Sequence, residues 1–255
     1  MRHLTSLEAG LLVLLIPGLA QAQGQAPLEQ VQAIPLEGVQ GKFDHLAADA
    51  NGKRLFVAAT AANAVVVVDL AQGKVARKIE GLAEPQGIAF MPDLKRLAIS
   101  NGDDGSLRIF DGETFKLLKS IDFGKDADDV LYDAETKRLY VGHEAGGLGI
   151  VDVEKMEKVG DIKLEAHPES FQLEKLGKRI FVNVPEARHI AVIDREKRTV
   201  LAKWPLEKLE SNFPMALDEA NHRLLVGCRK PSKMLVLDSE SGKEIAQVTI
   251  SRDTD

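Results

Sequence analysis

A short alternation of apolar runs and polar breaks recurs along most of this sequence. Its clearest copy spans residues 53–74, where an apolar run at 55–59 is followed by a polar break at 60–63 and a second apolar run at 65–68. Asp69 ends the second run, and the Gln-Gly-Lys sequence at 72–74 is typical of a turn. Short apolar runs bounded by turn residues predict buried strands. The stretch therefore predicts a β-hairpin.

Two markers show that this hairpin is one copy of a repeat. An arginine precedes the first apolar run of each copy, with gaps of 42, 42, 41 and 44 residues, and an aspartate ends the second run, with gaps of 42, 41, 42 and 44 residues. The arginines are Arg54, Arg96, Arg138, Arg179 and Arg223, and the aspartates are Asp69, Asp111, Asp152, Asp194 and Asp238. A period of about 40–45 residues with four strands per unit is typical of β-propellers. We therefore expect an all-β fold, a β-propeller of four-stranded antiparallel blades.

The repeat divides the chain into units. We place them at residues 43–82, 83–124, 125–164, 165–206 and 207–251, with a sixth unit starting at 252. In the second unit, strands are expected at 87–90, 96–100, 107–110 and 115–123. Residues 23–42 form a lead whose strand-like run at 31–36 is a candidate ring-closing strand, yet the fifth unit already has its own fourth strand at 244–250. We therefore expect an open ring, about five complete blades of seven, truncated at the C-terminus, with blade faces through which copies can self-associate.

The strand motifs carry a resemblance to a known family. The second-strand motif reads Ala-Ile-Ser-Asn at 98–101, Tyr-Val-Gly-His at 140–143 and Phe-Val-Asn-Val at 181–184. The third-strand motif reads Val-Val-Val-Val-Asp at 65–69, Ile-Ala-Val-Ile-Asp at 190–194 and Met-Leu-Val-Leu-Asp at 234–238. In these motifs the chain resembles the YVTN-repeat, or YncE-like, bacterial seven-bladed β-propellers, from about residue 43 to the end. The resemblance implies the fold; some similar propellers are lactonases, and nucleic-acid binding has been associated with YncE-like proteins.

The N-terminus and the bulk composition narrow the setting. Residues 1–22 have a weakly basic start, an apolar core at 10–19 and an Ala-Gln-Ala sequence at 20–22, which predict a secretory signal peptide and a periplasmic or secreted protein. No later segment is apolar for long enough to predict a transmembrane helix. Cys228 is the single cysteine, so an internal disulfide is excluded, and its strand context predicts a buried apolar role.

The candidate binding residues precede the first strand of each unit. In a propeller these segments lie at the mouth of the central channel, and here they differ from unit to unit while the strands repeat, which is typical of a site placed on a regular scaffold. The candidates are His45, Gln86, Asp128, Asp129, His167, Glu169 and Asn212. Their carboxylate, amide and imidazole groups can bind a divalent cation or act as acid and base, or can simply solvate a water-filled channel. The five repeated aspartates are interpreted as turn caps.

Three functions remain open, and the motifs rank them. The sequence contains no G-x-S-x-G, H-E-x-x-H, Walker or C-x-x-C motif, so no catalytic residue, metal ligand or cofactor is assigned. The favoured hypothesis is an exported, non-catalytic propeller that binds a small molecule or a protein partner at the channel mouth. The alternative is a lactonase-like hydrolase that uses channel His, Asp or Glu residues or a bound cation. A DNA-binding propeller is disfavoured by the net charge of −6 and the aromatic content of 5%.

Overall fold

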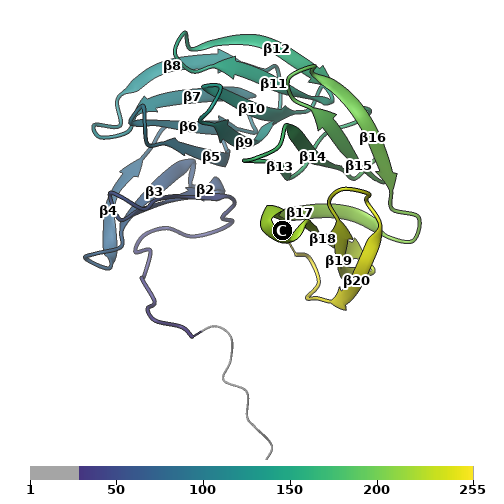
Figure 1. Ribbon diagram of the computed structural model, residues 1–255. Helices are drawn as coiled ribbons and strands as arrows, with labels where there is room; N and C mark the ends of the chain where they lie inside the picture. Colours follow the sequence, from purple (N-terminus) through teal and green to yellow (C-terminus); the bar gives the residue numbers. More distant parts are fainter. Residues whose placement is uncertain (1–28, 255) are drawn as a thin grey trace, which may run out of the picture. The chain divides into compact units, whose positions relative to one another are not determined.

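The predicted fold class is confirmed by a computed structural model of the chain, which describes residues 29–254. These residues form five four-stranded antiparallel sheets in a propeller arrangement (Figure 1). In every sheet the strand order follows the chain order. Two short 3-10 helices, η1 (Thr60–Ala62) and η2 (Glu219–Asn221), connect strands in the first and fifth blades.

Each blade takes four consecutive strands. Those of the first two blades are β1 (Leu46–Asp49), β2 (Arg54–Ala59), β3 (Ala64–Asp69), β4 (Lys74–Ile79), β5 (Pro85–Met91), β6 (Arg96–Asn101), β7 (Ser106–Asp111) and β8 (Leu117–Asp122). Those of the third and fourth blades are β9 (Ala127–Asp133), β10 (Arg138–His143), β11 (Gly147–Asp152), β12 (Glu157–Lys163), β13 (Phe171–Leu173), β14 (Arg179–Val184), β15 (His189–Asp194) and β16 (Thr199–Pro205). The fifth blade comprises β17 (Glu210–Asp218), β18 (Arg223–Lys230), β19 (Ser232–Asp238) and β20 (Glu244–Thr249).

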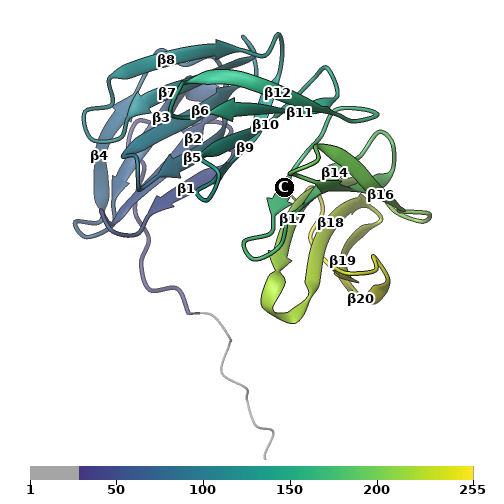
Figure 2. The ribbon, with the colours of Figure 1, turned by 45° about the horizontal axis from the view of Figure 1, so that its top comes forward.

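Burial follows the position of a strand within its blade. The first strands, such as β5, β9 and β17, are innermost, and the fourth strands lie at the periphery (Figures 1 and 2). All side chains of β3 except Asp69 are buried, whereas every side chain of β20 is exposed. The β-branched runs of the middle strands therefore reflect burial on both faces, as the sequence pattern predicts.

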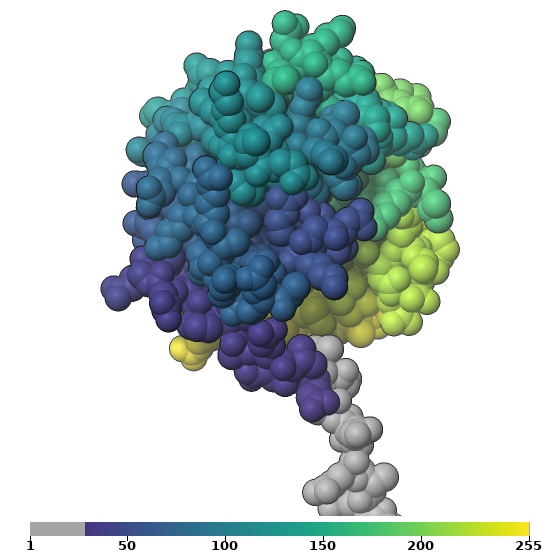
Figure 3. All heavy atoms as spheres, turned by 90° about the vertical axis from the view of Figure 1, so that its left-hand side faces the viewer, coloured from purple at the N-terminus to yellow at the C-terminus, as the bar shows by residue number. Residues whose placement is uncertain are grey.

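The core is divided into layers between neighbouring blades. One cluster joins β2 and β3 to β6 of the second blade, with Val65, Leu97 and Ile99 fully buried. Similar clusters join the second blade to the third, the third to the fourth, and the fourth to the fifth. Each fully buried aliphatic side chain contributes roughly 1.5–3 kcal/mol relative to exposure, so these layers dominate the folding energy. A view from the side of the first blade shows its atoms in continuous contact with those of the following blades (Figure 3).

Residues 34–39 pack on the outer face of the first blade, but not as a strand. Ile34, Leu36 and Val39 pack against the cluster that contains Val57 and Val66. Residues 29–42 form no strand, so the strand expected at 31–36 is not formed. Residues 34–39 therefore bury apolar side chains without pairing their backbone with a sheet edge. Among residues 29–254, no hydrophobic cluster joins the fifth blade to the first, and the two further blades expected from the repeat stay a prediction.

At three of the four boundaries between neighbouring blades, the repeated arginine of the earlier blade donates a hydrogen bond to the later blade. Arg54 Nη1 donates to the carbonyl of Gly112 at 2.7 Å, and Arg96 donates in the same way to the carbonyl of Val153. Arg179 Nη1 donates to the carbonyl of Ser239 at 2.9 Å. Each acceptor is the residue that follows the repeated aspartate of the next blade. Between the third and fourth blades the contact is reversed: Arg195, which follows the fourth aspartate, reaches back to Asp133 at 3.5 Å.

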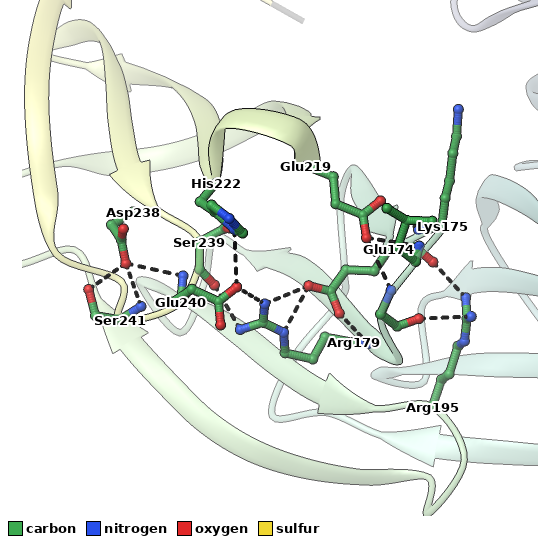
Figure 4. Close-up of polar contacts among 12 residues, drawn as sticks. Glu174, Lys175, Arg179, Arg195, Glu219, His222, Asp238, Ser239, Glu240 and Ser241 are labelled. Carbon is green, nitrogen blue, oxygen red and sulfur yellow. Dashed lines mark hydrogen bonds and ion pairs between the residues drawn. The ribbon is translucent and has the colours of Figure 1, made fainter.

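The arginine contact between the fourth and fifth blades is the most elaborate (Figure 4). Arg179 binds Glu174 through Nε at 2.9 Å and Nη2 at 2.5 Å, and Nη2 also lies 2.5 Å from Oε1 of Glu240. The Glu174 side chain is 6% exposed and that of Glu240 is 57% exposed. Beside this contact, Glu219 of the fifth blade accepts hydrogen bonds from three consecutive backbone N–H groups at 175–177 of the fourth blade. The two blades are therefore joined by polar contacts as well as by their apolar layer.

The other expectations from the sequence concern the signal peptide, membrane-spanning helices, Cys228 and the repeated aspartates. The expected signal peptide at 1–22 lies outside the described residues. Within residues 29–254, no helix is long and apolar enough to cross a membrane. Cys228 is fully buried, and burial raises the pKa of its thiol to about 11. Each repeated aspartate accepts hydrogen bonds from the backbone N–H groups two and three residues further on, at the turn before the fourth strand.

Candidate functional site: the channel mouth

A β-bulge at the start of the innermost strand aims the candidate residues of the third blade. Ala127 pairs with His143 and Val130 pairs with Val141, so Asp128 and Asp129 together face the single residue Gly142. Bulges of this kind locally increase the twist of a strand and redirect its side chains. The same shift occurs at the same place in two other blades, at Gln86-Gly87 opposite Ser100 and at Phe213-Pro214 opposite Gly227. The segments whose sequence varies between repeats are therefore also the segments where the pairing of the first and second strands is irregular.

Side chains on the second strand of one blade donate hydrogen bonds to the backbone of the bulge in the next blade. Ser100 Oγ donates to the carbonyl of Asp128 and accepts from Gly87 N at 2.8 Å. Asn183 Nδ2 makes the corresponding bond to the carbonyl of Phe213 at 2.8 Å. A Cβ atom on Gly87 would lie 2.5 Å from the Asp128 carbonyl oxygen, so this close approach of two blades requires glycine. These contacts fix the backbone from which Asp128 projects.

The bulged segments surround a cavity of about 640 Å³, which we call the channel-mouth cavity. All five blades or the segments that enter them contribute to its lining. The lining residues are Lys42, Phe43, Asp44, His45, Leu46, Gln86, Asp126, Asp128, His167, Glu169, Ser170, Phe213, Pro214, Met215 and Arg229. Five of the seven candidates from the sequence line the cavity, namely His45, Gln86, Asp128, His167 and Glu169. Its size falls within the range of about 300–1,000 Å³ that is typical of small-molecule sites.

Asp126, Asp128, His167 and Glu169 form one side of the cavity, which we call the acidic corner. His167 Nε2 lies 3.5 Å from Oδ2 of Asp128 and 4.0 Å from Oδ2 of Asp126. One ligating atom from each of Asp128, His167 and Glu169 lies within 4.8 Å of the others. Gln86 Nε2 donates to Oδ1 of Asp126 at 3.3 Å, which ties the second blade to the corner. The corner therefore combines side chains from the third and fourth blades in one small volume.

In the acidic corner, burial and the neighbouring charges shift the pKa values of the side chains in opposite directions. Burial raises the pKa of Asp126, and the charge of His167 offsets only part of this increase. Burial lowers the pKa of His167, but the carboxylates of Asp128, Asp126 and Glu169 outweigh it and raise the pKa above its usual value. Three carboxylates around one imidazole favour a cationic imidazole. The corner is therefore an electrostatically negative site in which a positive group is stabilised.

A second imidazole–carboxylate pair lies beside the corner. His45 Nδ1 is 3.6 Å from Oδ1 of Asp129, and Nε2 is 3.6 Å from Oδ1 of Asp44. Asp129 is buried, does not line the cavity, and accepts a hydrogen bond from Phe171 N at 3.4 Å. Burial raises the pKa of Asp129, and the His45 charge acts against this. Asp129 therefore has a supporting position behind His45.

The structure also separates one candidate from the cavity and adds others. Asn212 is fully buried, and its Nδ2 donates to Oδ1 of Asn183 at 2.8 Å, so it joins two blades instead of facing the cavity. Lys42 and Arg229 also line the cavity and are not among the seven candidates from the sequence. Arg229 lies at the end of β18 with its guanidinium 3.7 Å from the centre of the Phe213 ring.

Comparisons with known proteins agree with this architecture. No family model matches the chain. The chain is 28% identical over 107 residues to an uncharacterised protein, YncE, of Salmonella typhimurium, a match that covers 41% of this chain and 30% of that protein. Hydrazine synthase of Kuenenia stuttgartiensis shares the fold, with a TM-score of 0.75 at 16% identity, covering 86% of this chain and 70% of that one. The five blades make the chain a β-propeller, and the partial match shows a segment that is similar to YncE.

Proposed function

We propose that the chain is a non-catalytic binding protein whose channel-mouth cavity takes a small ligand with a positively charged group. The acidic corner carries this proposal: three carboxylates gather around one imidazole at the wall of a cavity of about 640 Å³. If His167 is protonated, these four groups together still have a charge of −2, three negative charges and one positive. A cationic group placed there gains electrostatic stabilisation in a partly desolvated site, where charges interact more strongly than in water.

Export is part of the same proposal. The sequence pattern at residues 1–22 supports a cleaved signal peptide, so the mature protein is expected to begin near Gln23. N-terminal sequencing of the protein recovered from the periplasm or medium tests this directly. Recovery of the chain with Met1 intact in the cytoplasm would contradict it.

A matched ligand panel tests the binding proposal. Thermal stability of the full chain is measured, with a metal chelator present, against small amines, polyamines and quaternary ammonium compounds and against carboxylates of similar size. We expect the cationic compounds to raise the melting temperature and Asp128→Asn to remove the effect. Glu196→Gln is the control, because Glu196 is exposed and pairs with Lys178 outside the cavity. Stabilisation by both charge classes, or equal loss in the control, would contradict the proposal.

A lactonase-like hydrolase is the second candidate, and one contact favours it. The 3.5 Å contact between His167 Nε2 and Oδ2 of Asp128 is an imidazole–carboxylate pair at the edge of the cavity, as a general base requires. The test is hydrolysis of a panel of sugar lactones by the full chain. Turnover that disappears in both His167→Ala and Asp128→Asn would replace the non-catalytic proposal.

A further inference from the structure

We propose that the acidic corner binds a divalent transition-metal ion, with Asp128, His167 and Glu169 as its protein ligands. This inference rests on the proposed function, because it names the cation that the channel-mouth cavity holds.

The spacing of the side chains suits a single ion. A tetrahedral ion with bonds of about 2.1 Å places its ligand atoms about 3.4 Å apart. His167 Nε2 and Asp128 Oδ2 are 3.5 Å apart, so this pair already has the required spacing. All three ligand atoms lie within 4.8 Å of one another, so the remaining contraction is at most about 1.4 Å (4.8 minus about 3.4). Rotation of the Glu169 side chain, which has three χ angles, can supply a movement of this size.

The backbone that presents the ligands is held in place by both blades. His167 and Glu169 flank Pro168 just before β13, and in an extended segment residues two positions apart point to the same side. Pro168 is buried, and its Cγ would lie 3.2 Å from a Cβ atom on Gly142. Asp128 comes from the bulge of β9, whose carbonyl Ser100 holds. An ion bound here would therefore link the third blade to the fourth.

The donor set indicates which ions fit. One imidazole nitrogen and two carboxylate oxygens favour Zn²⁺, Mn²⁺ or Co²⁺, because Ca²⁺ and Mg²⁺ prefer sites made of oxygen alone. An ion of charge +2 replaces the proton on His167 and reduces the charge of the corner from −2 to −1, because three carboxylates, a neutral imidazole and the ion sum to −1. Oδ2 of Asp126 lies 4.0 Å from the same nitrogen, Nε2 of His167, so Asp126 adds a third carboxylate near the ion. Positions on the cavity side of the ion stay open to water or a ligand.

The experiment uses the full chain after treatment with a chelator and removal of the chelator. Isothermal titration with ZnCl2, MnCl2 and CaCl2 measures the number of bound ions and the affinity, and Co²⁺ absorption reports the ligand geometry. We expect one Zn²⁺ or Mn²⁺ per chain, bound more tightly than Ca²⁺, and a higher melting temperature because the ion binds the folded state alone. His167→Ala and Asp128→Asn should each weaken binding by about 100-fold or more, since even outer groups are worth about 10- to 100-fold.

Two control variants remove the same chemical groups from outside the corner. His222→Ala removes an imidazole that is 64% exposed, and Glu84→Gln removes a carboxylate from the corresponding segment of the second blade, outside the cavity. Both should keep the affinity of the parent. Glu169→Gln, which keeps the shape of the side chain, tests the third ligand if an alanine variant fails to fold.

The outcomes separate this inference from the proposed function. Equal affinity in His167→Ala and His222→Ala, or tighter binding of Ca²⁺ than of Zn²⁺ and Mn²⁺, would overturn the metal site. If no ion binds but ammonium compounds still bind through Asp128, the metal inference fails and the proposed function stands. If neither class of cation binds, both fail.

Discussion

Replacing Arg179 with alanine should destabilise the boundary between the fourth and fifth blades far more than the same change at Arg223. The two arginines occupy the same position of the repeat. Arg179 contacts Glu174, Glu240 and the carbonyl of Ser239. The side chain of Arg223 is exposed and makes no hydrogen bond or ion pair within residues 29–254. The comparison therefore isolates the contact to the next blade from the properties of arginine in this strand.

The structure sets the magnitude of the loss. Removing one partner of a buried ion pair costs about 3–5 kcal/mol, because the other charge stays buried. That range is an upper bound here, since the Arg179 side chain is 20% exposed and Glu174 keeps a hydrogen bond of 2.8 Å from the backbone N of Arg179. The bond to the Ser239 carbonyl adds about 1 kcal/mol. The pair with Glu240 adds little, because that carboxylate is 57% exposed. We expect a total of about 3 kcal/mol for Arg179→Ala, and less than about 0.5 kcal/mol for Arg223→Ala.

Urea denaturation is the assay, followed by circular dichroism and by fluorescence of the single tryptophan. Trp204 lies on β16 with its ring centre 5.6 Å from that of Phe181, and it packs against Gly242 of the fifth blade, so its emission reports on this boundary. Arg179→Lys should fall between the parent and Arg179→Ala, because lysine keeps the charge without the planar fork. Equal losses of unfolding free energy in Arg179→Ala and Arg223→Ala would refute the reasoning.

Three further predictions follow from single features. Burial raises the pKa of the Cys228 thiol to about 11, so the folded chain should react with iodoacetamide at pH 8 far more slowly than the denatured chain, and equal rates would contradict its buried position. The backbone N–H of Lys155 and the charge of Arg138 outweigh burial and lower the pKa of Asp152, so its stabilisation is present above the unfolded pKa of 3.8 and is lost as pH falls through the lower folded pKa. Asp152→Asn should therefore reduce stability at pH 7, with a difference from the parent that shrinks below pH 4 in acid denaturation; a constant difference would argue against this. Leu225 pairs with Val236 on the fifth blade, and both side chains are only partly buried. Leu225→Lys should therefore reduce self-association of the chain in sedimentation velocity. A parent protein that is monomeric in this assay would disprove the prediction.

Much of the fold could be predicted because short apolar runs and turn residues indicate each strand, and the same pattern recurs in every unit. The strands expected at 87–90, 96–100 and 107–110 are β5, β6 and β7 with one to two more residues at their ends. The expected strand at 31–36 failed because an apolar run predicts burial, not a partner for backbone hydrogen bonding. In the structure Ile34 and Leu36 bury their side chains against the first blade without joining its sheet.

The site was only partly predictable because its geometry depends on contacts between blades. The variable segments before each unit pointed to His45, Asp128, His167 and Glu169, and the cavity brings these together. The β-bulges that aim them result from pairing between strands, which no single segment encodes. Asn212 looked equivalent to the others in sequence, but its amide is used between Asn183 and the backbone of His189.

The arginine contacts give the series of blades a direction. At the boundaries where Arg54, Arg96 and Arg179 act, the donor belongs to the earlier blade and the acceptor to the later one. The fifth blade therefore presents a donor, Arg223, while the matching acceptor on the first blade is the carbonyl of Leu70, which no arginine of residues 29–254 reaches. The donor on the fifth blade of one molecule can pair with the acceptor on the first blade of another, whereas two donors or two acceptors cannot pair. A contact between that donor and that acceptor would join molecules head to tail, as in a ring or a filament, and would not produce a twofold dimer.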